Sequence, residues 1–278
     1  MSRHYKGATA VITGGATGIG FALAEALAAE GAKVVIASTN DERIRKAVGA
    51  IESKGGVAAG ISCDVSRRDD VARLLTNTLD RFGSVDLLCA NAGVVTGGPL
   101  LDHQPNDWNW VYDVTLRGIT HCIELFYPYM AKRRRGQIMV TGSLLGIVPD
   151  WCVGSGPYPS AKAAAMAIGM ALRAEAAACN VEVSVMIPGP VRTEMLMSSR
   201  SRTEAYGGPV NAPMPLPTPR SGGPQPDASM PLLLSPEEVA KITIEGLRVN
   251  APVIATHKSM RPVVKDYFDR LLSAWDAA

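Results

Sequence analysis

"TGGATGIG", residues 13–20, is the stretch that decides the fold of this 278-residue chain. It follows a short β-branched run, "ATAVITG" (8–14), and opens an apolar helical pattern, "IGFALAEALAAEG" (19–31). Its spaced glycines permit a tight turn, close approach of a pyrophosphate to the backbone, and close packing of helix on strand. The free N–H groups of the first helical turn would hold that pyrophosphate. The stretch therefore predicts a phosphate-binding turn, with a glycine-rich turn that binds nothing as the alternative.

The remainder of the chain repeats this alternation of strand and helix. Seven apolar runs are predicted strands, at residues 8–14, 32–38, 57–65, 85–93, 136–143, 181–189 and 251–257. Helical patterns lie between and after them, at 19–31, 40–56, 68–83, about 107–135, 158–179, 235–250 and 261–275. Nearly continuous apolar strands are typical of a parallel sheet with helices on both faces. The chain therefore predicts one Rossmann-like, doubly wound α/β domain, residues 1–278, around a seven-stranded parallel sheet.

The alternation breaks between residues 195 and 236. This segment is polar and glycine-rich, and nine of the 19 prolines of the chain fall between Pro209 and Pro236. A long segment of this kind inside a compact domain is usually a functional lid or a disordered insert. We expect a substrate lid at 195–236, followed by a helix with Ser235 as its N-cap and Pro236 at its first position.

Composition narrows the class of partner. Apolar residues make up 47% of the chain and charged residues 19%, and the net charge is +2, which indicates neither nucleic acid nor an anionic membrane as a partner. The N-terminus shows no secretory signal, and no apolar run approaches the roughly 20 residues that span a bilayer. No CxxC pair occurs, so no disulfide framework and no metal site are expected. We expect a soluble, cytoplasmic protein.

Five motifs occur in one order and together resemble the short-chain dehydrogenase/reductase family. They are the glycine turn TGxxxGIG, "NAG" at 91–93, a serine ending the fifth predicted strand, Tyr-x-x-x-Lys, and "PGPVRT" at 188–193. The resemblance covers about residues 5–260. It implies a Rossmann-like fold, an NAD(P) cofactor, and a small-molecule alcohol or ketone as substrate.

Matched residue by residue, the resemblance implies a cofactor site. The residues that would hold the dinucleotide phosphates are Gly14, Thr17, Gly18, Ile19 and Gly20. Those that would contact the adenine and line the ribose are Asp64, Val65, Asn91, Ala92 and Gly93. Those that would hold the nicotinamide carboxamide and phosphate are Pro188, Gly189, Val191 and Thr193. Taken alone, Asn, Gly and Pro at strand ends are ordinary chain terminators, so the order of the motifs carries this expectation.

Tyr158 and Lys162 are four residues apart and share one face of a predicted helix. A tyrosine with its ordinary pKa of about 10 is a poor base at neutral pH. A nearby ammonium, like the charge of an oxidised nicotinamide, lowers that pKa, so Tyr158 can exchange a proton with an alcohol or carbonyl oxygen. Lys162 would also bond the nicotinamide ribose, and Ser143 would hydrogen-bond the substrate oxygen. Without the glycine turn and Ser143, the pair would be read as a solvated helix edge.

One position departs from the family pattern. Relatives usually carry an asparagine in an "N-x-x-G" setting, which kinks the helix and holds a water in a proton relay to the lysine. This chain reads "DVTLRG", so Thr115 stands at that place. Its hydroxyl can bond a water or a backbone carbonyl but offers no amide. We count Thr115 with the catalytic residues and expect a modified relay, partly supplied by solvent.

The end of the second predicted strand indicates which dinucleotide binds. An acidic residue about 20 positions after the glycine turn would bind the ribose 2′-hydroxyl of NAD. Ser38 stands there and Thr39 follows, and this uncharged pair does not repel a 2′-phosphate. Arg43 could reach such a phosphate or could be an exposed helix residue. The pattern favours NADP over NAD.

The substrate should bind outside the carboxyl ends of the strands. Leu144, Trp151, Met195 and Leu196 are expected to line that space, with core filling as the alternative for Met195. The expected reaction interconverts a secondary alcohol and a ketone on an apolar or aromatic substrate. A 3-ketoacyl-type reductase and a catalytically weak dinucleotide-binding redox sensor or scaffold stay open as alternatives. The alanine-rich helix after Lys162 predicts a homo-oligomer, either a dimer or a tetramer.

Overall fold

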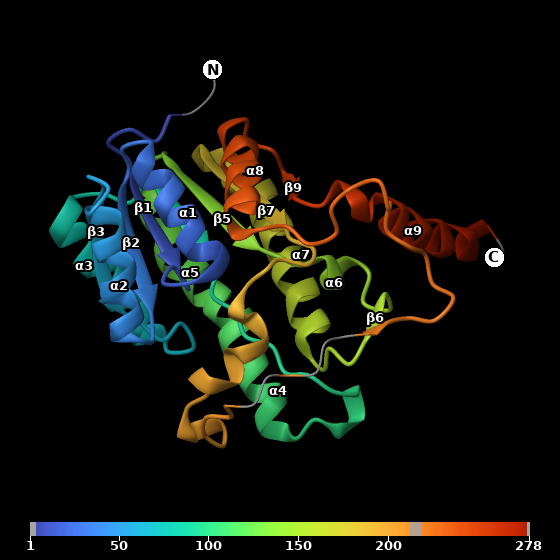
Figure 1. The fold of residues 1–278 in the computed structure, drawn as a ribbon. Coiled ribbons are helices and arrows are strands. Elements are labelled where there is room, and N and C mark those ends of the chain that lie inside the picture. Colours follow the sequence, from blue (N-terminus) through green and yellow to red (C-terminus); the bar gives the residue numbers. More distant parts are fainter. Residues whose placement is uncertain (1–3, 212–213, 215–217, 277–278) are drawn as a thin grey trace.

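A seven-stranded parallel β-sheet forms the centre of the computed structural model, which describes residues 4–211, 214 and 218–276. Its strand order is β3-β2-β1-β4-β5-β7-β9 (Figure 1). The strands are β1 (Thr9–Thr13), β2 (Lys33–Ser38), β3 (Val57–Ser62), β4 (Leu87–Ala90), β5 (Gly136–Thr141), β7 (Val181–Ile187) and β9 (Val253–Ala255). The order reverses between β1 and β4, and a parallel sheet binds ligands at the carboxyl ends of strands beside such a reversal. The predicted fold class is confirmed.

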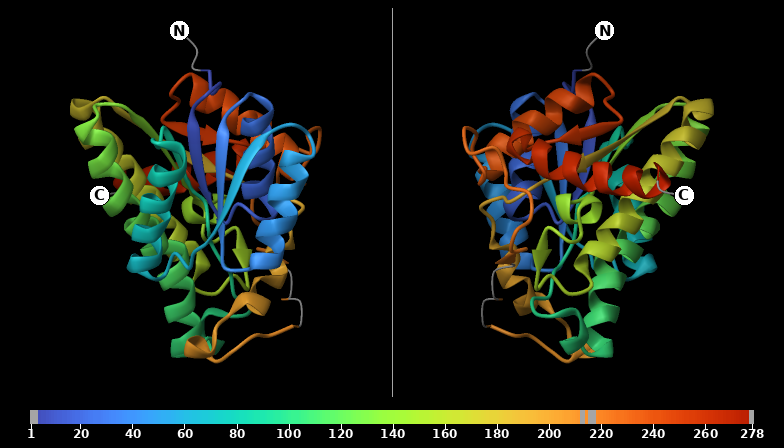
Figure 2. Two further views of the ribbon diagram at one scale, coloured as in Figure 1. Left: turned by 90° about the vertical axis from the view of Figure 1, so that its left-hand side faces the viewer. Right: turned by 90° about the vertical axis from the view of Figure 1, so that its right-hand side faces the viewer.

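Helices cover both faces of the sheet (Figure 2). One face carries α1 (Gly18–Ala29), α2 (Asp41–Glu52) and α8 (Pro236–Arg248). The other carries α3 (Arg68–Phe82), α5 (Gly118–Lys132) and α7 (Tyr158–Ala176). Alternate strand residues serve the two cores: Ile12 and Ile36 pack on the first face, and Val11 and Val35 on the second. Burial on both faces explains why the strands show no polar alternation.

Local capping signals set several helix ends. The side chain of Asn40 accepts a hydrogen bond from the N–H of Arg43 at the start of α2. Ser235 and Glu238 form a reciprocal capping box at the start of α8, so the predicted N-cap is confirmed. Gly83 ends α3 with a φ of +78°, a conformation that favours glycine.

The helix expected over residues 107–135 differs from a regular helix in its middle. It consists of α4 (Pro105–Val111), a π-helical turn η2 (Tyr112–Arg117) and α5. A π-turn holds one extra residue per turn and is frequent at functional sites. Thr115 lies within this turn, so the position that departs from the family pattern is also the position where the helix widens.

The segment after β7 carries more structure than the sequence indicated. It contains two short 3₁₀ helices, η4 (Glu194–Ser201) and η5 (Glu204–Tyr206), and a strand β8 (Thr218–Pro219) that pairs antiparallel with β6 (Cys152–Val153). Residues 212–213 and 215–217 of the expected lid lie outside the described residues. The remaining short helices are η1 (Leu100–Asp102), α6 (Leu144–Ile147), η3 (Ala177–Cys179) and η6 (Lys258–Met260). The last helix, α9 (Arg261–Asp276), extends away from the sheet (Figure 1).

Candidate active site

The glycine turn between β1 and α1 leaves no room for side chains. Gly14 and Gly18 have φ angles of +63° and +56°, which favour glycine. A Cβ added to Gly20 would lie 2.3 Å from the carbonyl oxygen of Gly14, and one on Gly18 would lie 3.2 Å from Cγ2 of Thr193. Backbone without side chains at Gly18 and Gly20, where a helix begins with unbonded N–H groups, fits the pyrophosphate of a dinucleotide.

Asn91 joins the carboxyl ends of three neighbouring strands. Its Nδ2 donates to the carbonyl oxygen of Thr13 at 3.0 Å, and its Oδ1 accepts from Oγ1 of Thr141 at 3.2 Å. Oγ1 of Thr13 also accepts from the N–H groups of Asn91 and Ala92, at 3.0 and 3.1 Å. Sequence reasoning assigned Asn91 and Ala92 to the cofactor site but missed both threonines. The available signal was that each threonine directly precedes a glycine at a strand end.

Lys162 is buried beside the backbone of Gly93. Its side chain is 1% exposed, and its Nζ donates to the carbonyl oxygen of Thr141 at 2.7 Å. A Cβ added to Gly93 would lie 3.5 Å from this Nζ and 3.6 Å from Oγ1 of Thr115. Burial lowers the pKa of Lys162 from 10.5 to about 7. The structure thus brings three of the predicted site residues to one point.

Thr115 uses its hydroxyl on the backbone that continues from β4. Its Oγ1 accepts from the N–H of Val94 at 3.0 Å and donates to the carbonyl oxygen of Val94 at 3.1 Å. The Thr115 side chain is fully buried. The hydroxyl therefore fixes Val94, the residue that follows Gly93, in its present conformation.

Tyr158 is the first residue of α7 and is 9% exposed. Burial raises the pKa of Tyr158 to about 12, and a hydrogen bond with the side chain of Ser143 opposes that rise. The direction is opposite to the lowered pKa expected from the nearby lysine. Nζ of Lys162 lies 5.8 Å from the centre of the tyrosine ring. Burial nevertheless raises the pKa of Tyr158, because it disfavours the charged form of each group, the phenolate of Tyr158 and the ammonium of Lys162.

Ser143 follows β5 and serves as the N-cap of α6. Its Oγ accepts from the N–H of Leu145 at 3.2 Å and is hydrogen-bonded to Tyr158. The side chain is 7% exposed. A serine held at a strand end beside Tyr158 can reach a substrate oxygen that approaches the same phenol.

A histidine that the sequence did not single out holds the "PGPVRT" segment. His257 Nδ1 accepts from the N–H of Gly189 at 3.0 Å, so Nε2 carries the proton and donates to the carbonyl oxygen of Pro190 at 2.8 Å. Burial lowers the pKa of His257 and favours this neutral form. The carbonyl oxygen of Pro188 accepts from the N–H of Leu144 at 2.9 Å. His257 lies 68 residues after Gly189, and such a distance hides the pairing from sequence patterns.

The rest of that segment leads into the insert. Val191 forms a parallel bridge with Leu234, and Oγ1 of Thr193 accepts from the N–H of Met195 at 3.3 Å. Because Thr193 lies against Gly18, these contacts place the start of the insert over the start of α1.

The residues assigned to the adenosine half lie at the ends of β2 and β3. Ser38 ends β2 and Thr39 is exposed beside it. Oδ1 of Asp64 accepts from the backbone and side chain of Ser66, at 3.0 and 2.7 Å. The carbonyl oxygen of Val65 is 2.9 Å from Nδ1 of His121.

Arg43, near the start of α2, contacts the insert. Its Nη2 lies 3.9 Å from Oε2 of Glu194, and both side chains are partly solvent-exposed. Arg43 is the third residue of α2, and this helix begins three residues after Ser38, the last residue of β2.

The four residues predicted to contact substrate separate into two groups. Leu144 and Trp151 are 4% and 8% exposed and pack with Met260 and Val263 of the C-terminal segment. Met195 packs against the cluster that contains Tyr158. The backbone of Leu196 accepts a hydrogen bond from the N–H of Met214. The cluster around Tyr158 has these apolar neighbours: Val94, Val95, Trp110, Val111, Val114, Leu116, Leu145, Met195, Tyr206 and Met214.

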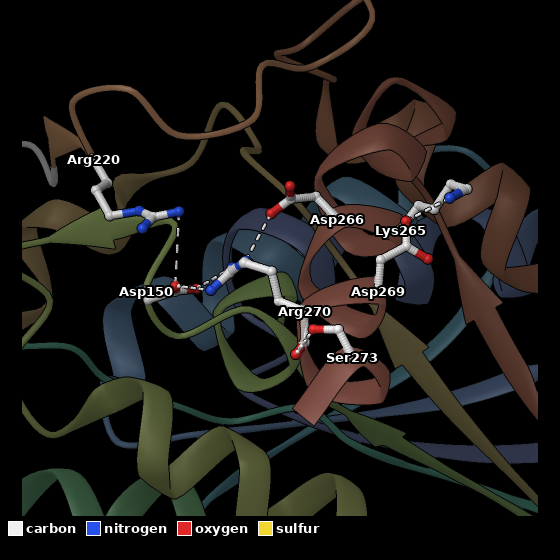
Figure 3. Close-up of polar contacts among 7 residues, drawn as sticks. All are labelled: Asp150, Arg220, Lys265, Asp266, Asp269, Arg270 and Ser273. Atoms are coloured by element: carbon white, nitrogen blue, oxygen red, sulfur yellow. Dashed lines mark hydrogen bonds and ion pairs between the residues drawn. The ribbon is translucent and has the colours of Figure 1, made fainter. Parts of the chain in front are cut away.

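The loop between α6 and β6 is tied to α9 by charge. Oδ2 of Asp150 lies 3.0 Å from Nη1 of Arg270 and 3.9 Å from Nη2 of Arg220 (Figure 3). Nε of Arg270 also binds Asp266 one turn earlier, at 2.9 Å. These pairs connect three segments, namely the loop before Tyr158, the insert and the C-terminal helix.

Among the described residues, no helix combines the length and apolar character needed to cross a membrane, and no group of three or more His, Cys, Asp or Glu residues could hold a metal ion. The free cysteines are Cys63, Cys89, Cys122, Cys152 and Cys179.

Comparison with known proteins gives consistent matches. The sequence model of short chain dehydrogenases matches residues 8–204. C alpha-dehydrogenase of Sphingobium sp. is 30% identical over 281 residues, which cover 98% of this chain and 88% of that protein. The 3-oxoacyl-[acyl-carrier-protein] reductase FabG of Salmonella typhimurium is 30% identical over 246 residues, which cover 88% of this chain and 97% of that protein. A solved short chain dehydrogenase/reductase from Burkholderia phymatum, in complex with NAD, is 29% identical and has a TM-score of 0.85. The match covers 98% of this chain and 96% of that chain.

Proposed function

We propose that this chain, which belongs to the short-chain dehydrogenase/reductase family, interconverts a secondary alcohol and a ketone with Tyr158 as its acid–base group. The chain is an NAD(P)-dependent oxidoreductase. One observation carries the reaction proposed: the buried phenol of Tyr158 is hydrogen-bonded to Ser143, with Nζ of Lys162 5.8 Å from its ring. Ser143 follows β5 at the carboxyl end of the sheet, and Lys162 lies beside Gly93.

In the mechanism, the residues of the chain orient the substrate and move one proton. The hydroxyl of Ser143 holds the substrate oxygen, and Tyr158 exchanges a proton with it. With a pKa of about 12, Tyr158 is protonated at neutral pH and ready to donate to a carbonyl oxygen. In the direction of oxidation, positive charge nearby lowers that pKa and lets the phenolate accept the alcohol proton. A dinucleotide bound at the glycine turn supplies or accepts the hydride.

Thr115 supports a modified proton relay. Its hydroxyl bonds both backbone groups of Val94, which leaves one acceptor lone pair for a water on the way to Lys162. Solvent then supplies the remainder of the relay. The test is Thr115→Asn: a large fall in turnover with unchanged cofactor binding supports a positive role for threonine, and unchanged turnover argues against one.

The substrate proposed is an apolar or aromatic ketone or alcohol. The cluster that contains Tyr158 supports this class, because Val94, Val95 and Trp110 belong to it and Met195 packs against it. Apolar walls with a few placed polar groups are typical of small-molecule sites. The name of the relative C alpha-dehydrogenase is consistent with oxidation at a carbon that bears a hydroxyl group.

The cofactor proposed is NADP in preference to NAD. Ser38 and Thr39 supply no carboxylate at the end of β2, and Arg43 follows in the first turn of α2. This uncharged pair would not repel a 2′-phosphate, and such a phosphate could draw Arg43 away from Glu194. The affinities for NADP and for NAD, measured separately, decide this point. Arg43→Ala should weaken the binding of NADP and leave the binding of NAD unchanged.

A homo-oligomer, dimer or tetramer, is also proposed. The side chains of Ala163, Ala167 and Met170 are exposed along α7, and small residues let a second helix approach closely. Light scattering coupled to gel filtration gives the mass, and Ala167→Arg should shift the protein toward the monomer.

The deciding experiment is a panel of aryl alkyl ketones and secondary aryl alcohols, run with NADP(H) and NAD(H) separately. Acetophenone and 1-phenylethanol are the first probes. Tyr158→Phe should lose at least about 100-fold in turnover while it keeps cofactor affinity. Unimpaired activity of Tyr158→Phe would overturn the mechanism, and cofactor binding without turnover on the whole panel would favour a redox sensor.

The similarity to FabG favours a second candidate, reduction of carrier-linked 3-ketoacyl groups. Such an enzyme would need a basic surface that docks an acidic carrier protein. Binding to an acyl carrier protein that weakens steeply with salt would support this candidate. A preference for free aryl ketones would exclude it.

A further inference from the structure

The chain that follows Gly93 leaves the sheet, because β4 ends at Ala90. Past a strand end, backbone N–H and C=O groups lose their ladder partners and must be satisfied in another way. In this chain two side-chain hydroxyls form these hydrogen bonds. Thr115 binds both backbone groups of Val94, and Ser198 binds both backbone groups of Val95.

The contacts of Ser198 are reciprocal hydrogen bonds. Its Oγ accepts from the N–H of Val95 at 3.2 Å and donates to the carbonyl oxygen of Val95 at 3.0 Å. Ser198 belongs to the insert and lies 103 residues after Val95. Val95 is 7% exposed and belongs to the apolar cluster around Tyr158. The two bonds therefore connect the insert directly to the wall of the catalytic centre.

Ser198 lies in the middle of a segment, residues 194–206, that we call the insert arm. At its outer end, Nη1 of Arg202 binds Oδ1 of Asp107 at 2.6 Å, with side chains only 12% and 19% exposed. The hydroxyl of Tyr206 donates to Oδ2 of Asp113 at 3.0 Å. Two independent contacts therefore fix the outer end of the arm on α4 and on the π-turn η2.

The inner end of the arm meets the cofactor and substrate regions. Thr193, just before the arm, lies against Gly18 of the glycine turn. Met195 packs with Tyr158 and Val95 in one cluster. Between the inner and outer ends, Ser198 ties the arm to the strand-end backbone beside Lys162. Its hydroxyl thus fixes the arm on Val95, a member of the same cluster as Tyr158.

We propose that Ser198 is a positioning residue, which holds the insert arm closed over the catalytic centre through its two hydrogen bonds to Val95. The expected effect on substrate binding rests on the proposed function. The expected effect on the closure of the arm does not. With the arm closed, apolar side chains cover Tyr158 and exclude water from the proton transfer. With the bonds to Val95 removed, the arm opens more often, and substrate is held less tightly.

The test compares three serine variants of the full-length protein. Ser198→Ala removes both bonds to Val95, and Ser198→Thr keeps a hydroxyl at the same place. Ser201→Ala is the matched control, because Oγ of Ser201 bonds the carbonyl oxygen of Ser198 within the same short helix and does not contact Val95. Hydrogen exchange at the Val95 amide and across the arm is measured with no substrate present.

We expect Ser198→Ala to speed exchange at Val95 and in the arm about tenfold, and to raise KM for acetophenone by a similar factor. The affinity for NADPH, measured by fluorescence, should stay as in the unmodified protein. Ser198→Thr should restore most of the protection, and Ser201→Ala should behave like the unmodified protein. Together, faster exchange at Val95, a raised KM and unchanged cofactor affinity separate positioning from a general loss of structure.

Two results would overturn the inference. The first is unchanged exchange at Val95 in Ser198→Ala, and the second is an equal loss of protection in Ser201→Ala. Failure of the proposed function gives a different result. Neither the unmodified protein nor any variant then turns over the ketone, but Ser198→Ala still speeds hydrogen exchange at Val95.

Discussion

Nζ of Lys162 donates a hydrogen bond to the carbonyl oxygen of Thr141 at 2.7 Å, in a place where the lysine is 1% exposed. The contact fixes the ammonium between β5 and Gly93, but a single carbonyl replaces little of the water that burial removes. The pKa of Lys162 therefore falls from 10.5 to about 7. A buried lysine of this kind makes the stability of the protein depend on pH.

Lys162→Met should remove a rise of stability with pH. Between about pH 7 and pH 10.5 the unfolded chain binds one proton more than the folded chain, so the free energy of unfolding increases with pH. The increase is at most about 1.4 kcal/mol per pH unit in that range and vanishes below it. Urea unfolding at about pH 7 and about pH 9 measures it. Equal pH dependence in both proteins would contradict the lowered pKa.

Thr115→Val should destabilise the fold by about 1–3 kcal/mol, because it leaves both backbone groups of Val94 without their hydroxyl partner at nearly constant volume. The control is Thr120→Val. The exposed Thr120 hydroxyl bonds the carbonyl oxygen of Arg117, three residues earlier at the end of η2, so its loss should cost much less. The midpoints of urea unfolding compare the stability of the two variants, provided that the dependence of the unfolding free energy on urea concentration is the same in both. Similar losses in both variants would show that Thr115 has no special role at Val94.

Gly20→Ala should weaken dinucleotide binding by at least about tenfold. Its Cβ would lie 2.3 Å from the carbonyl oxygen of Gly14 and 2.7 Å from Nδ2 of Asn91, so the turn must open to admit it. Gly49→Ala is the matched control, since its Cβ meets nothing within 4 Å in helix α2. That change should leave affinity unaltered and increase stability by about 0.5–1 kcal/mol. Fluorescence titration with NADPH and NADH gives the affinities.

Asp150→Asn should loosen α9 and the loop before Tyr158 without unfolding the protein. The change removes the charge that Arg270 and Arg220 share (Figure 3). Because these side chains are about two-fifths exposed, we expect only a few-fold faster hydrogen exchange in α9, and less at high salt. Asp269→Asn, which breaks the exposed pair with Lys265 on the same helix, serves as the control. Equal exchange in the two variants would show that Asp150 does not anchor α9.

Much of the fold was predictable because its signals are local. The glycine turn, the apolar strands and the cap at Ser235 each depend on residues within about one helical turn or one strand. The helical pattern over residues 107–135 gave no sign of the π-turn at residues 112–117, although the family position at Thr115 implied a kink; within this turn the Thr115 hydroxyl bonds Val94, 21 residues earlier. The 3₁₀ helices of the insert were missed for a similar reason: they are held by Asp107 and Asp113 rather than by their own sequence.

The site residues divide in the same way. Tyr158, Lys162 and Ser143 were predicted from motif order, and the structure brings them together. Leu144 and Trp151 were predicted to line the substrate space; that stays a prediction, and the structure adds that they pack with Met260 and Val263 of the C-terminal segment. Nothing in residues 144–156 indicates that a helix more than 100 residues later covers them.

The sequence by itself determined the alternation of strand and helix and the glycine turn, because each follows from short-range geometry, and the order of its motifs predicted Tyr158 as the acid–base group. Tertiary structure decided which polar groups meet across the chain: Thr13 and Thr141 on Asn91, His257 on Gly189, and Ser198 on Val95. The physical reason is that buried backbone groups at the strand ends must find partners, and the fold supplies them from whichever segment packs there.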